Sequence, residues 1–288
     1  MVGFCFGLAQ LVQAQSFNRH FDAFNTQYEQ TALNIESTEE GWMVFSSIYE
    51  PDTISPDSII GIFTIAFQRI DALGDIVFEK KFKISNKALY LGWADCCDTV
   101  RGGGFVSSGT RETPPIPTFD VELVRYNSLG DTLWTRSYGS SGHFWIGAQV
   151  KQTPDGGFVI CGYTDADGSY YSGFALKTDS LGVEQWRHTY GLSTYYDDFN
   201  CVILMPDGYV LAGRSYTPSD HYDFHVTRID SLGNVIWNKY WGSPYEEPSP
   251  SLLALQDGRL LLGGAWGTPF DLFETPYVVF LDPATGDT

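Results

Sequence analysis

Aromatic and acidic residues gather in short segments of this 288-residue sequence, between runs of alternating apolar residues. A Tyr or Trp ring can cover the apolar face of a sugar while a neighbouring carboxylate accepts hydrogen bonds from its hydroxyls. The same rings suit protein contacts, because they combine a large apolar area with a polar tip. In the alternative interpretation they pack loops onto the body of the protein. The candidate ligand-binding residues are Trp145, Tyr170, Tyr171, Tyr195, Tyr196, Asp197, Tyr245 and Trp266.

One segment has residues that could bind a metal ion. Asp165 and Asp167, followed by Gly168, have the beginning of a calcium loop, in which hard oxygen donors precede a glycine turn. The third acid and the terminal Glu of an EF-hand loop do not follow. Calcium is therefore a possible ligand of this segment, and no other cofactor is expected. His221 and His225 have the spacing of a zinc helix, but on a strand four residues span about 13 Å, too far for one ion.

Catalytic motifs are not evident. The sequence contains no nucleophile elbow, phosphate loop or dinucleotide fingerprint. Carboxylates could still converge from different segments, as in two-acid glycosidases, and Asp165, Asp197, Asp198 and Glu246 are the candidates. The primary interpretation is a non-enzymatic protein that binds a glycan or another protein. The alternative is a glycan-active hydrolase or lyase with carboxylates on the same face.

An internal repeat defines the elements that must position these residues. Residues 230–237 read Asp-Ser-Leu-Gly-Asn-Val-Ile-Trp, and the pattern of an acid or amide, a Gly and an aromatic recurs upstream. Its glycines are Gly74, Gly130, Gly182 and Gly233, spaced 51 to 56 residues apart. Alternating runs flank each turn, which is typical of a β-hairpin. An interval of this length is typical of the blades of a β-propeller.

A second turn, exemplified by Asp155-Gly156 and Asp207-Gly208, recurs in step with the first. Each repeat therefore contains two hairpins and four antiparallel strands, and both tight turns must lie at one end of the sheet. The longer connections then gather at the opposite face, where we expect a ligand to bind. The fifth copy stops after three strands, and residues 17–21 (Phe-x3-Phe) could supply the fourth. We predict an all-β propeller of five four-stranded blades closed by this N-terminal strand; a fragment of a six- to eight-bladed propeller is the alternative.

Composition restricts the partners. The formal net charge of −18 would repel a phosphate backbone, so nucleic-acid binding is not expected. Residues 1–14 are apolar and end in small residues, as a secretory signal peptide does, although the usual basic start is lacking. A buried first strand is the competing interpretation. We predict a secreted or cell-surface monomer without a membrane span, in which residues 15–288 form one propeller domain.

Cys96 and Cys97 are adjacent, and on a strand their side chains would point to opposite faces. We therefore expect no metal or redox pair there. Cys97 and Cys201 each lie eight residues before a turn aromatic, as Val150 does, which indicates small buried apolar residues.

The repeat phrase Thr-Pro-Asp-Gly-Gly-Phe at residues 153–158, with the Asp-Ser-Leu-Gly turn and a Trp-x3-Tyr-Gly ending, resembles the blades of secreted bacterial β-propeller proteins, many of them exported by the type IX system. Residues 281–286 are also similar to the turn of pyrroloquinoline-quinone-type propeller repeats. The first resemblance implies a secreted propeller. The second implies that Trp134, Trp186 and Trp237 dock one blade against the next, and it does not imply a quinone cofactor.

Overall fold

The computed structural model describes residues 30–38, 41–55, 58–84, 87–92, 95–113, 118–168, 170–191, 196–216, 221–242, 250–266 and 275–288. Within these ranges every element is a strand, and the strands form five antiparallel sheets. Four of the sheets are meanders in which strands adjacent in sequence are hydrogen-bonded, and in the fifth both β5 and β6 pair with β7 before the meander continues. The structure is therefore the predicted all-β propeller, and we number its sheets blade 1 to blade 5. No helix in these ranges could cross a membrane.

The strand bounds follow the repeat. Blade 1 contains β1 (Gln30–Thr38), β2 (Gly41–Ser55), β3 (Ser58–Asp71) and β4 (Ile76–Phe82); blade 2 contains β5 (Ala88–Leu91), β6 (Cys97–Thr99), β7 (Phe105–Thr113), β8 (Thr118–Tyr126) and β9 (Thr132–Tyr138). Blade 3 contains β10 (Trp145–Gln152), β11 (Phe158–Thr164), β12 (Ser172–Thr178) and β13 (Glu184–Tyr190); blade 4 contains β14 (Asp197–Met205), β15 (Gly208–Tyr216), β16 (Tyr222–Asp230) and β17 (Val235–Trp241). Blade 5 contains β18 (Ser251–Ala254), β19 (Leu260–Trp266) and β20 (Thr275–Leu281).

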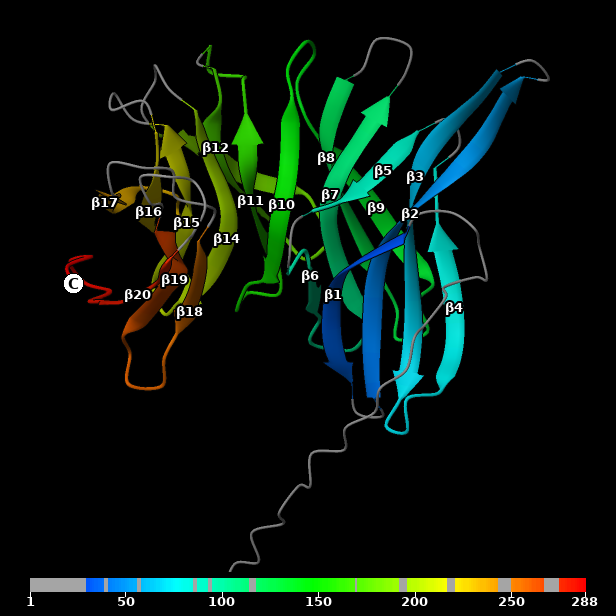
Figure 1. The fold of residues 1–288 in the computed structure, drawn as a ribbon, viewed down its shortest axis with the longest axis horizontal. Coiled ribbons are helices and arrows are strands. Elements are labelled where there is room, and N and C mark those ends of the chain that lie inside the picture. Colours follow the sequence, from blue (N-terminus) through cyan, green and yellow to red (C-terminus); the bar gives the residue numbers. More distant parts are fainter. Residues whose placement is uncertain are drawn as a thin grey trace, which may run out of the picture.

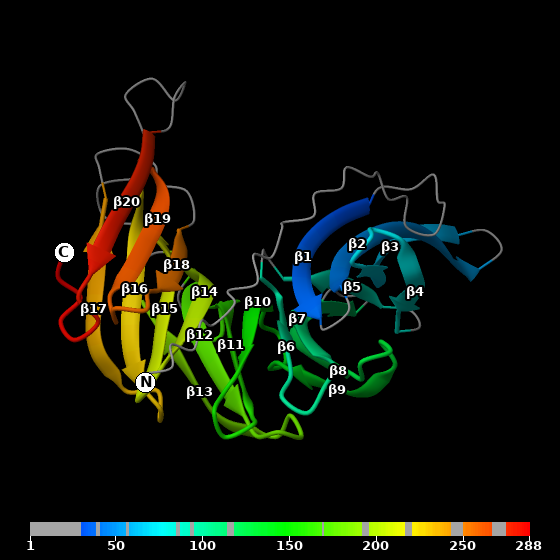
Figure 2. The same cartoon turned by 90° about the horizontal axis from the view of Figure 1, so that it is seen from below.

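The blades follow one another around an arc, with the first strand of each blade on the inside (Figure 2). Consecutive blades are in contact, and β10 of blade 3 contacts β14 of blade 4, which in turn contacts β18 of blade 5. This is the radial order expected of propeller blades. Residues 17–21, which were predicted to complete blade 5, and the predicted signal peptide at residues 1–14 lie outside the described residues.

Each blade is fastened to the next through its outer strand. Tyr138 donates a hydrogen bond to Gly182 O in the turn of blade 3 (2.6 Å), and Tyr190 donates one to Gly233 O in blade 4 (2.9 Å). The indole nitrogens of Trp186 and Trp237 likewise donate to turn carbonyls of the following blade, at 3.1 and 2.9 Å. The prediction that these tryptophans dock one blade against the next is confirmed.

The turn glycines are required at this junction. Gly182 has a φ of 75°, which disfavours any residue with a Cβ. A Cβ there would also lie 3.0 Å from the ring of Trp134 in the preceding blade. The recurring turn glycine thus serves both the hairpin and the contact between blades.

Both tight turns of each blade lie at one end and the longer connections at the other (Figure 1). We call the end with the longer connections the loop face. Blade 1 has a longer hairpin than the other blades, because residues 50–55 continue β2. The strands β2 and β3 stay paired as far as Ser55 and Ser58. The run of β-branched residues here, Thr53, Ile59 and Ile60, favours a longer hairpin.

The inner strand of blade 2 also differs. It begins at Ala88, and it is interrupted between β5 and β6. Asp95 has a φ of 63°, and Cys96 lies in this interruption, so the alternation expected of a strand does not apply. The Sγ atoms of Cys96 and Cys97 are 3.8 Å apart, so the expectation that they face opposite sides was wrong. Both thiols are free and buried, and burial raises the pKa of Cys97.

Candidate functional site

Six tyrosines form one cluster on the loop face, where blades 3 and 4 meet. They come from the end of β11, the connection to β12, the start of β14 and β16, and the end of β15. Ring centroids of Tyr171 and Tyr196 are 5.2 Å apart, and those of Tyr216 and Tyr222 are 5.1 Å apart. Two rings, Tyr170 and Tyr196, are 65% and 37% exposed. The tyrosine cluster consists of Tyr163, Tyr170, Tyr171, Tyr196, Tyr216 and Tyr222.

Backbone hydrogen bonds fix the segments that carry these rings. Tyr171 and Tyr196 form an isolated parallel bridge between the two blades. Asp197 N donates to Tyr171 O at 3.0 Å, and Tyr216 N donates to Tyr196 O at 2.7 Å. The rings are therefore held on extended backbone rather than on free loops, which reduces the entropy lost when a ligand orders them.

The cluster encloses a hollow of about 200 Å³. Four of its tyrosine rings line the hollow, and the charged groups lie among them. Burial raises the pKa of Tyr163, so its hydroxyl is neutral at physiological pH and can both donate and accept a hydrogen bond. The lining residues are Tyr163, Tyr171, Tyr196, Asp197, Asp198, Arg214 and Tyr222.

An ion pair between neighbouring strands lines the hollow. Arg214 Nη2 lies 2.7 Å from Asp198 Oδ2, and both side chains are partly buried. The Arg214 guanidinium also lies 4.6 Å from the centre of the Tyr222 ring, a cation–π contact. A donor and an acceptor are thereby held side by side between aromatic rings, as recognition of adjacent hydroxyls requires.

Asp197 has a structural environment. Its carboxylate is buried, and its Oδ1 lies 3.2 Å from Nδ1 of His225, which is also buried. The other ring nitrogen of His225 lies 2.7 Å from Asn238 Oδ1, and its ring stacks on Tyr240 at 4.5 Å. A Cβ on Gly191 would lie 2.4 Å from Asp197 Oδ2. Asp197 therefore anchors the start of β14 beneath the hollow.

The preceding blade junction repeats this arrangement with different residues. Phe119 and Phe144 form the equivalent parallel bridge between blades 2 and 3, and their rings are also 5.2 Å apart. An ion pair again lies nearby, between Arg111 Nη2 and Asp120 Oδ2 at 2.8 Å. At this junction the two bridging rings are phenylalanines instead of tyrosines.

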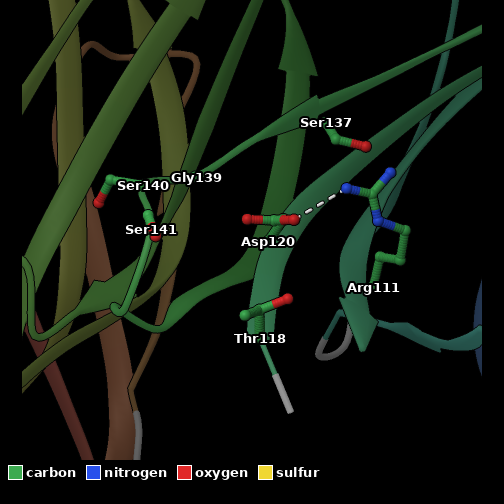
Figure 3. Close-up of a pocket in the computed structure, with 7 residues that line it drawn as sticks. All are labelled: Arg111, Thr118, Asp120, Ser137, Gly139, Ser140 and Ser141. Atoms are coloured by element: carbon green, nitrogen blue, oxygen red, sulfur yellow. Dashed lines mark hydrogen bonds and ion pairs between the residues drawn. The ribbon is translucent and has the colours of Figure 1, made fainter. Parts of the chain in front are cut away.

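A second hollow, of about 370 Å³, opens beside this ion pair, and we call it the Arg111 hollow. Figure 3 shows Asp120 between the Arg111 guanidinium on one side and residues 139–141 on the other. Among the described residues no aromatic ring lines it, since its walls are hydroxyls, charged groups and backbone. The lining residues are Arg111, Thr118, Asp120, Ser137, Gly139, Ser140 and Ser141.

Four of the predicted site residues meet in the tyrosine cluster or line its hollow: Tyr170, Tyr171, Tyr196 and Asp197. Trp145 is elsewhere. It is 4% exposed, packs against Phe174 at 5.1 Å and donates its indole N–H to Ser140 Oγ. Tyr195, Tyr245 and Glu246 lie outside the described residues, and Trp266 is the last residue of β19.

Sequence reasoning missed Tyr163, Tyr216 and Arg214, which lie inside strands rather than in the connections. Tyr222 was expected in a connection on the loop face, and it is the first residue of β16. A signal for two of them exists. Tyr163 and Arg214 directly follow the glycines Gly162 and Gly213, which occupy the same place in β11 and β15, opposite Phe174 and His225. Aligning the repeats on these glycines places both side chains at the loop face.

The predicted calcium segment is occupied by protein contacts at one of its acids. Asp165 Oδ1 accepts a hydrogen bond from Phe144 N at 2.7 Å and lies 3.3 Å from His143 Nδ1. In the part of the chain that the structure describes, no three His, Cys, Asp or Glu side chains are grouped as a metal ion would require. Calcium at Asp165 and Asp167 stays a prediction.

Comparison with known proteins gives structural likeness only. No family profile and no curated protein matches the sequence. An endo-arabinase from Bacteroides thetaiotaomicron VPI-5482 is 11% identical with a TM-score of 0.49, over 83% of this chain and 89% of that one. CoXyl43, a β-xylosidase/α-arabinofuranosidase of glycoside hydrolase family GH43 from a compost metagenome, is 9% identical with a TM-score of 0.43, over 92% and 94%.

The haemagglutinin-neuraminidase ectodomain of parainfluenza virus 5 is 8% identical with a TM-score of 0.46, over 91% of this chain and 72% of that one. Several of the similar structures are glycoside hydrolases. At these identities and scores, neither a ligand nor the role of any residue is transferred to this chain.

Proposed function

We propose that this protein recognises a glycan through the tyrosine cluster. The observation that supports this proposal is the hollow lined by tyrosine rings and by the Asp198–Arg214 pair. The ring faces suit the C–H surface of a sugar, and the ion pair offers an acceptor and a donor to adjacent hydroxyls. A protein partner would use the same rings, and it is the outcome to pursue if no glycan binds.

The nature of the glycan follows from charge. Asp198 already neutralises Arg214 at 2.7 Å, and the whole chain carries a formal charge of −18. An acidic sugar would meet this field without an unpaired cation to receive its carboxylate. We therefore propose a neutral glycan as the ligand of the tyrosine cluster.

A glycan array with the purified protein tests the proposal, followed by titration of each positive glycan. The double variant Tyr171→Ala/Tyr196→Ala removes both bridging rings. It should weaken binding at least about thirtyfold, because each buried aromatic contact of a binding site contributes about 2 kcal/mol. An array without selective binding, or unchanged affinity in the variant, would overturn the proposal.

The matched control is Phe119→Ala/Phe144→Ala, which makes the same change at the junction between blades 2 and 3. This variant should lose stability to a similar extent and keep its affinity for the glycan. Equal loss of affinity in both double variants would show that the effect comes from damaged blade packing.

A glycan-active hydrolase or lyase at the same hollow is the second candidate. It is favoured by the carboxylate of Asp198 and the tyrosine hydroxyls in one hollow, since both kinds of group can move protons. Asp197 and Asp165 are less suited, because one is buried against His225 and the other is bonded to Phe144. Release of reducing or unsaturated products, abolished by Asp198→Asn, would establish this activity.

We also propose that the protein is exported to the medium or the cell surface, on the basis of residues 1–14 and the type IX resemblance. Fractionation of cells that express the full chain, compared with a chain lacking residues 2–14, tests this. Retention of both chains inside the cell would contradict it.

A further inference from the structure

We propose that the Arg111 hollow is a second binding site, and that its ligand is a hydroxyl-rich molecule with an ammonium group, such as an amino sugar. It lies at the junction of blades 2 and 3 and is separate from the tyrosine cluster. Its volume of about 370 Å³ falls within the range of roughly 300–1,000 Å³ that is usual for small-molecule sites.

The first argument is the buried acid behind the hollow. Glu122 is 2% exposed, and its Oε2 lies 3.4 Å from Arg111 Nη1 and accepts a hydrogen bond from Ser137 Oγ. Both of these partners line the hollow. Burial raises the pKa of Glu122, although Ser137 and Arg111 act in the opposite direction.

The second argument is a pair of polar atoms without partners. Among the described residues neither Glu122 Oε1 nor Arg111 Nε makes a hydrogen bond, although both atoms are buried. Buried polar groups are nearly always satisfied, so such atoms need an explanation. A polar ligand, with the water that accompanies it, would supply their partners.

The third argument is the balance of charge. Arg111 faces two carboxylates, those of Asp120 and Glu122. Lys87 also acts on Glu122, but its ammonium group is bonded to Thr113. Two carboxylates therefore share one guanidinium in direct contact, which favours a cation over a neutral or acidic ligand.

The hydroxyls supply the remaining selectivity. Ser140 Oγ accepts the indole N–H of Trp145 and so can donate its own proton. Ser137 donates to Glu122 and so can accept. Thr118 and Ser141 complete a wall that can both donate to and accept from sugar hydroxyls.

A structural role of Asp120 is compatible with this site. Its Oδ1 stands over Gly139, where a Cβ would lie 1.8 Å away. Asp223 stands over Gly242 in the same way at 1.7 Å, and its partner is His221 at 3.1 Å. The buried Glu122 behind the ion pair distinguishes the Arg111 hollow, because the same position holds Phe174 in blade 3 and His225 in blade 4.

Amide chemical shifts of the labelled protein, titrated at pH 7.5 with glucosamine, glucose and glucuronate, test the proposal. Glucosamine should shift residues 118–122 and 137–141 and bind about tenfold more tightly than glucose, the value of one partly screened charge pair. Glucuronate should not bind there. Absence of these shifts, equal affinity for glucosamine and glucose, or shifts confined to other residues would overturn the proposal.

Glu122→Gln keeps the shape of the side chain and should abolish the preference for glucosamine over glucose. Asp257→Asn removes one charge from an exposed turn far from the hollow in sequence, and it should keep the preference. Loss in both variants would assign the preference to the overall charge and contradict the proposal. If Glu122→Gln does not fold, Ser140→Ala replaces it as the test variant. Its affinity for both glucosamine and glucose should be several-fold lower than that of the parent protein.

The two proposed sites can fail separately. Tyr171→Ala/Tyr196→Ala should leave the glucosamine shifts at residues 137–141 unchanged, because those residues belong to the other junction. A change there in this variant would show that the two hollows are one site.

Discussion

The two junctions of blade 3 share a backbone plan and differ in their side chains. On one side Phe119 bridges to Phe144, and on the other Tyr171 bridges to Tyr196, each pair in parallel and with ring centroids 5.2 Å apart. An Arg–Asp pair accompanies both. The repeat therefore supplies the position of the bridging rings, and the residue type decides whether hydroxyls are added. The ion pairs are placed differently, because Arg111 and Asp120 belong to the second and third strands of blade 2, whereas Asp198 and Arg214 belong to the first and second strands of blade 4.

The residues around the two bridges differ as well. Tyr163, Tyr216 and Tyr222 surround the second bridge, whereas the first has serine hydroxyls and a buried glutamate beside it. Equivalent bridges thus have an aromatic hollow beside them at one junction and a polar hollow at the other. Four comparisons test how far this division holds.

The largest effect is expected from alanine at the glycines that follow the outer strands. Gly191 has a φ of 132°, and a Cβ there would lie 2.4 Å from Oδ2 of the buried Asp197. Gly191→Ala should cost about 3 kcal/mol of folding free energy through strain and overpacking. Gly139→Ala should cost about 1 kcal/mol, because Asp120 is more exposed and can move. Denaturant unfolding measures both, and equal losses would contradict this reasoning.

The next largest difference is expected between the two arginines of the ion pairs, in the stability lost when each is replaced. Arg111→Gln leaves the buried Glu122 without its cation and should cost about 2 kcal/mol at neutral pH. Arg214→Gln breaks a pair that is 26% and 15% exposed and should cost less than about 1 kcal/mol. Thermal unfolding of the two variants side by side checks the order, which a reversed ranking would refute.

Exchanging one hydroxyl should have an intermediate effect on binding and little on folding. Tyr171→Phe removes a polar tip from the tyrosine cluster and should weaken glycan binding several-fold, the value of one hydrogen bond of about 1 kcal/mol. Phe119→Tyr adds a hydroxyl at the other junction and should leave that affinity unchanged. Calorimetric titration of both variants gives the answer, and no loss in the first would remove Tyr171 from the site.

The smallest effect concerns pH. Burial raises the pKa of Glu122 above its usual 4.5, so the folded state favours the protonated form. Its contribution to stability is then fully present below the unfolded pKa and is lost as pH rises through the folded pKa. Glu122→Gln should therefore be more stable, relative to the parent, at pH 7 than at pH 4, by less than about 1 kcal/mol. A relative stability that does not change with pH would contradict the assignment.

Much of the fold follows from local patterns in the sequence. Turns with glycine and an acid, together with alternating runs, predict the strands of blades 3 and 4, because hairpins depend on neighbouring residues. The loop face follows from the number of tight turns in each blade. The long β2–β3 hairpin and the early start of β5 were not predicted. The length of a strand depends on how far its neighbour pairs with it, and this pairing cannot be deduced from the sequence of one strand alone.

The site was predicted only where rings lie in connections. Tyr170, Tyr171 and Tyr196 were found because aromatic residues in loops stand out, whereas Tyr163 and Tyr216 resemble ordinary strand residues. Glu122 was missed as well, although an acid within the run Val121-Glu122-Leu123-Val124 is a signal of a buried charge. Neither hollow could be predicted, since each is formed by residues from separate strands or blades.

The bonds from Tyr138 to Gly182 and from Tyr190 to Gly233 run from each blade to the one that follows it in sequence. During synthesis the outer strand of a blade therefore emerges before the turn that will hold it. Blades 2 and 3 are each left without this bond until 44 and 43 further residues have been translated, roughly 2 to 9 s at ordinary ribosome speeds. The outer strands of these blades consequently become fixed in order from the N-terminus, each after the turn of the next blade has been synthesised.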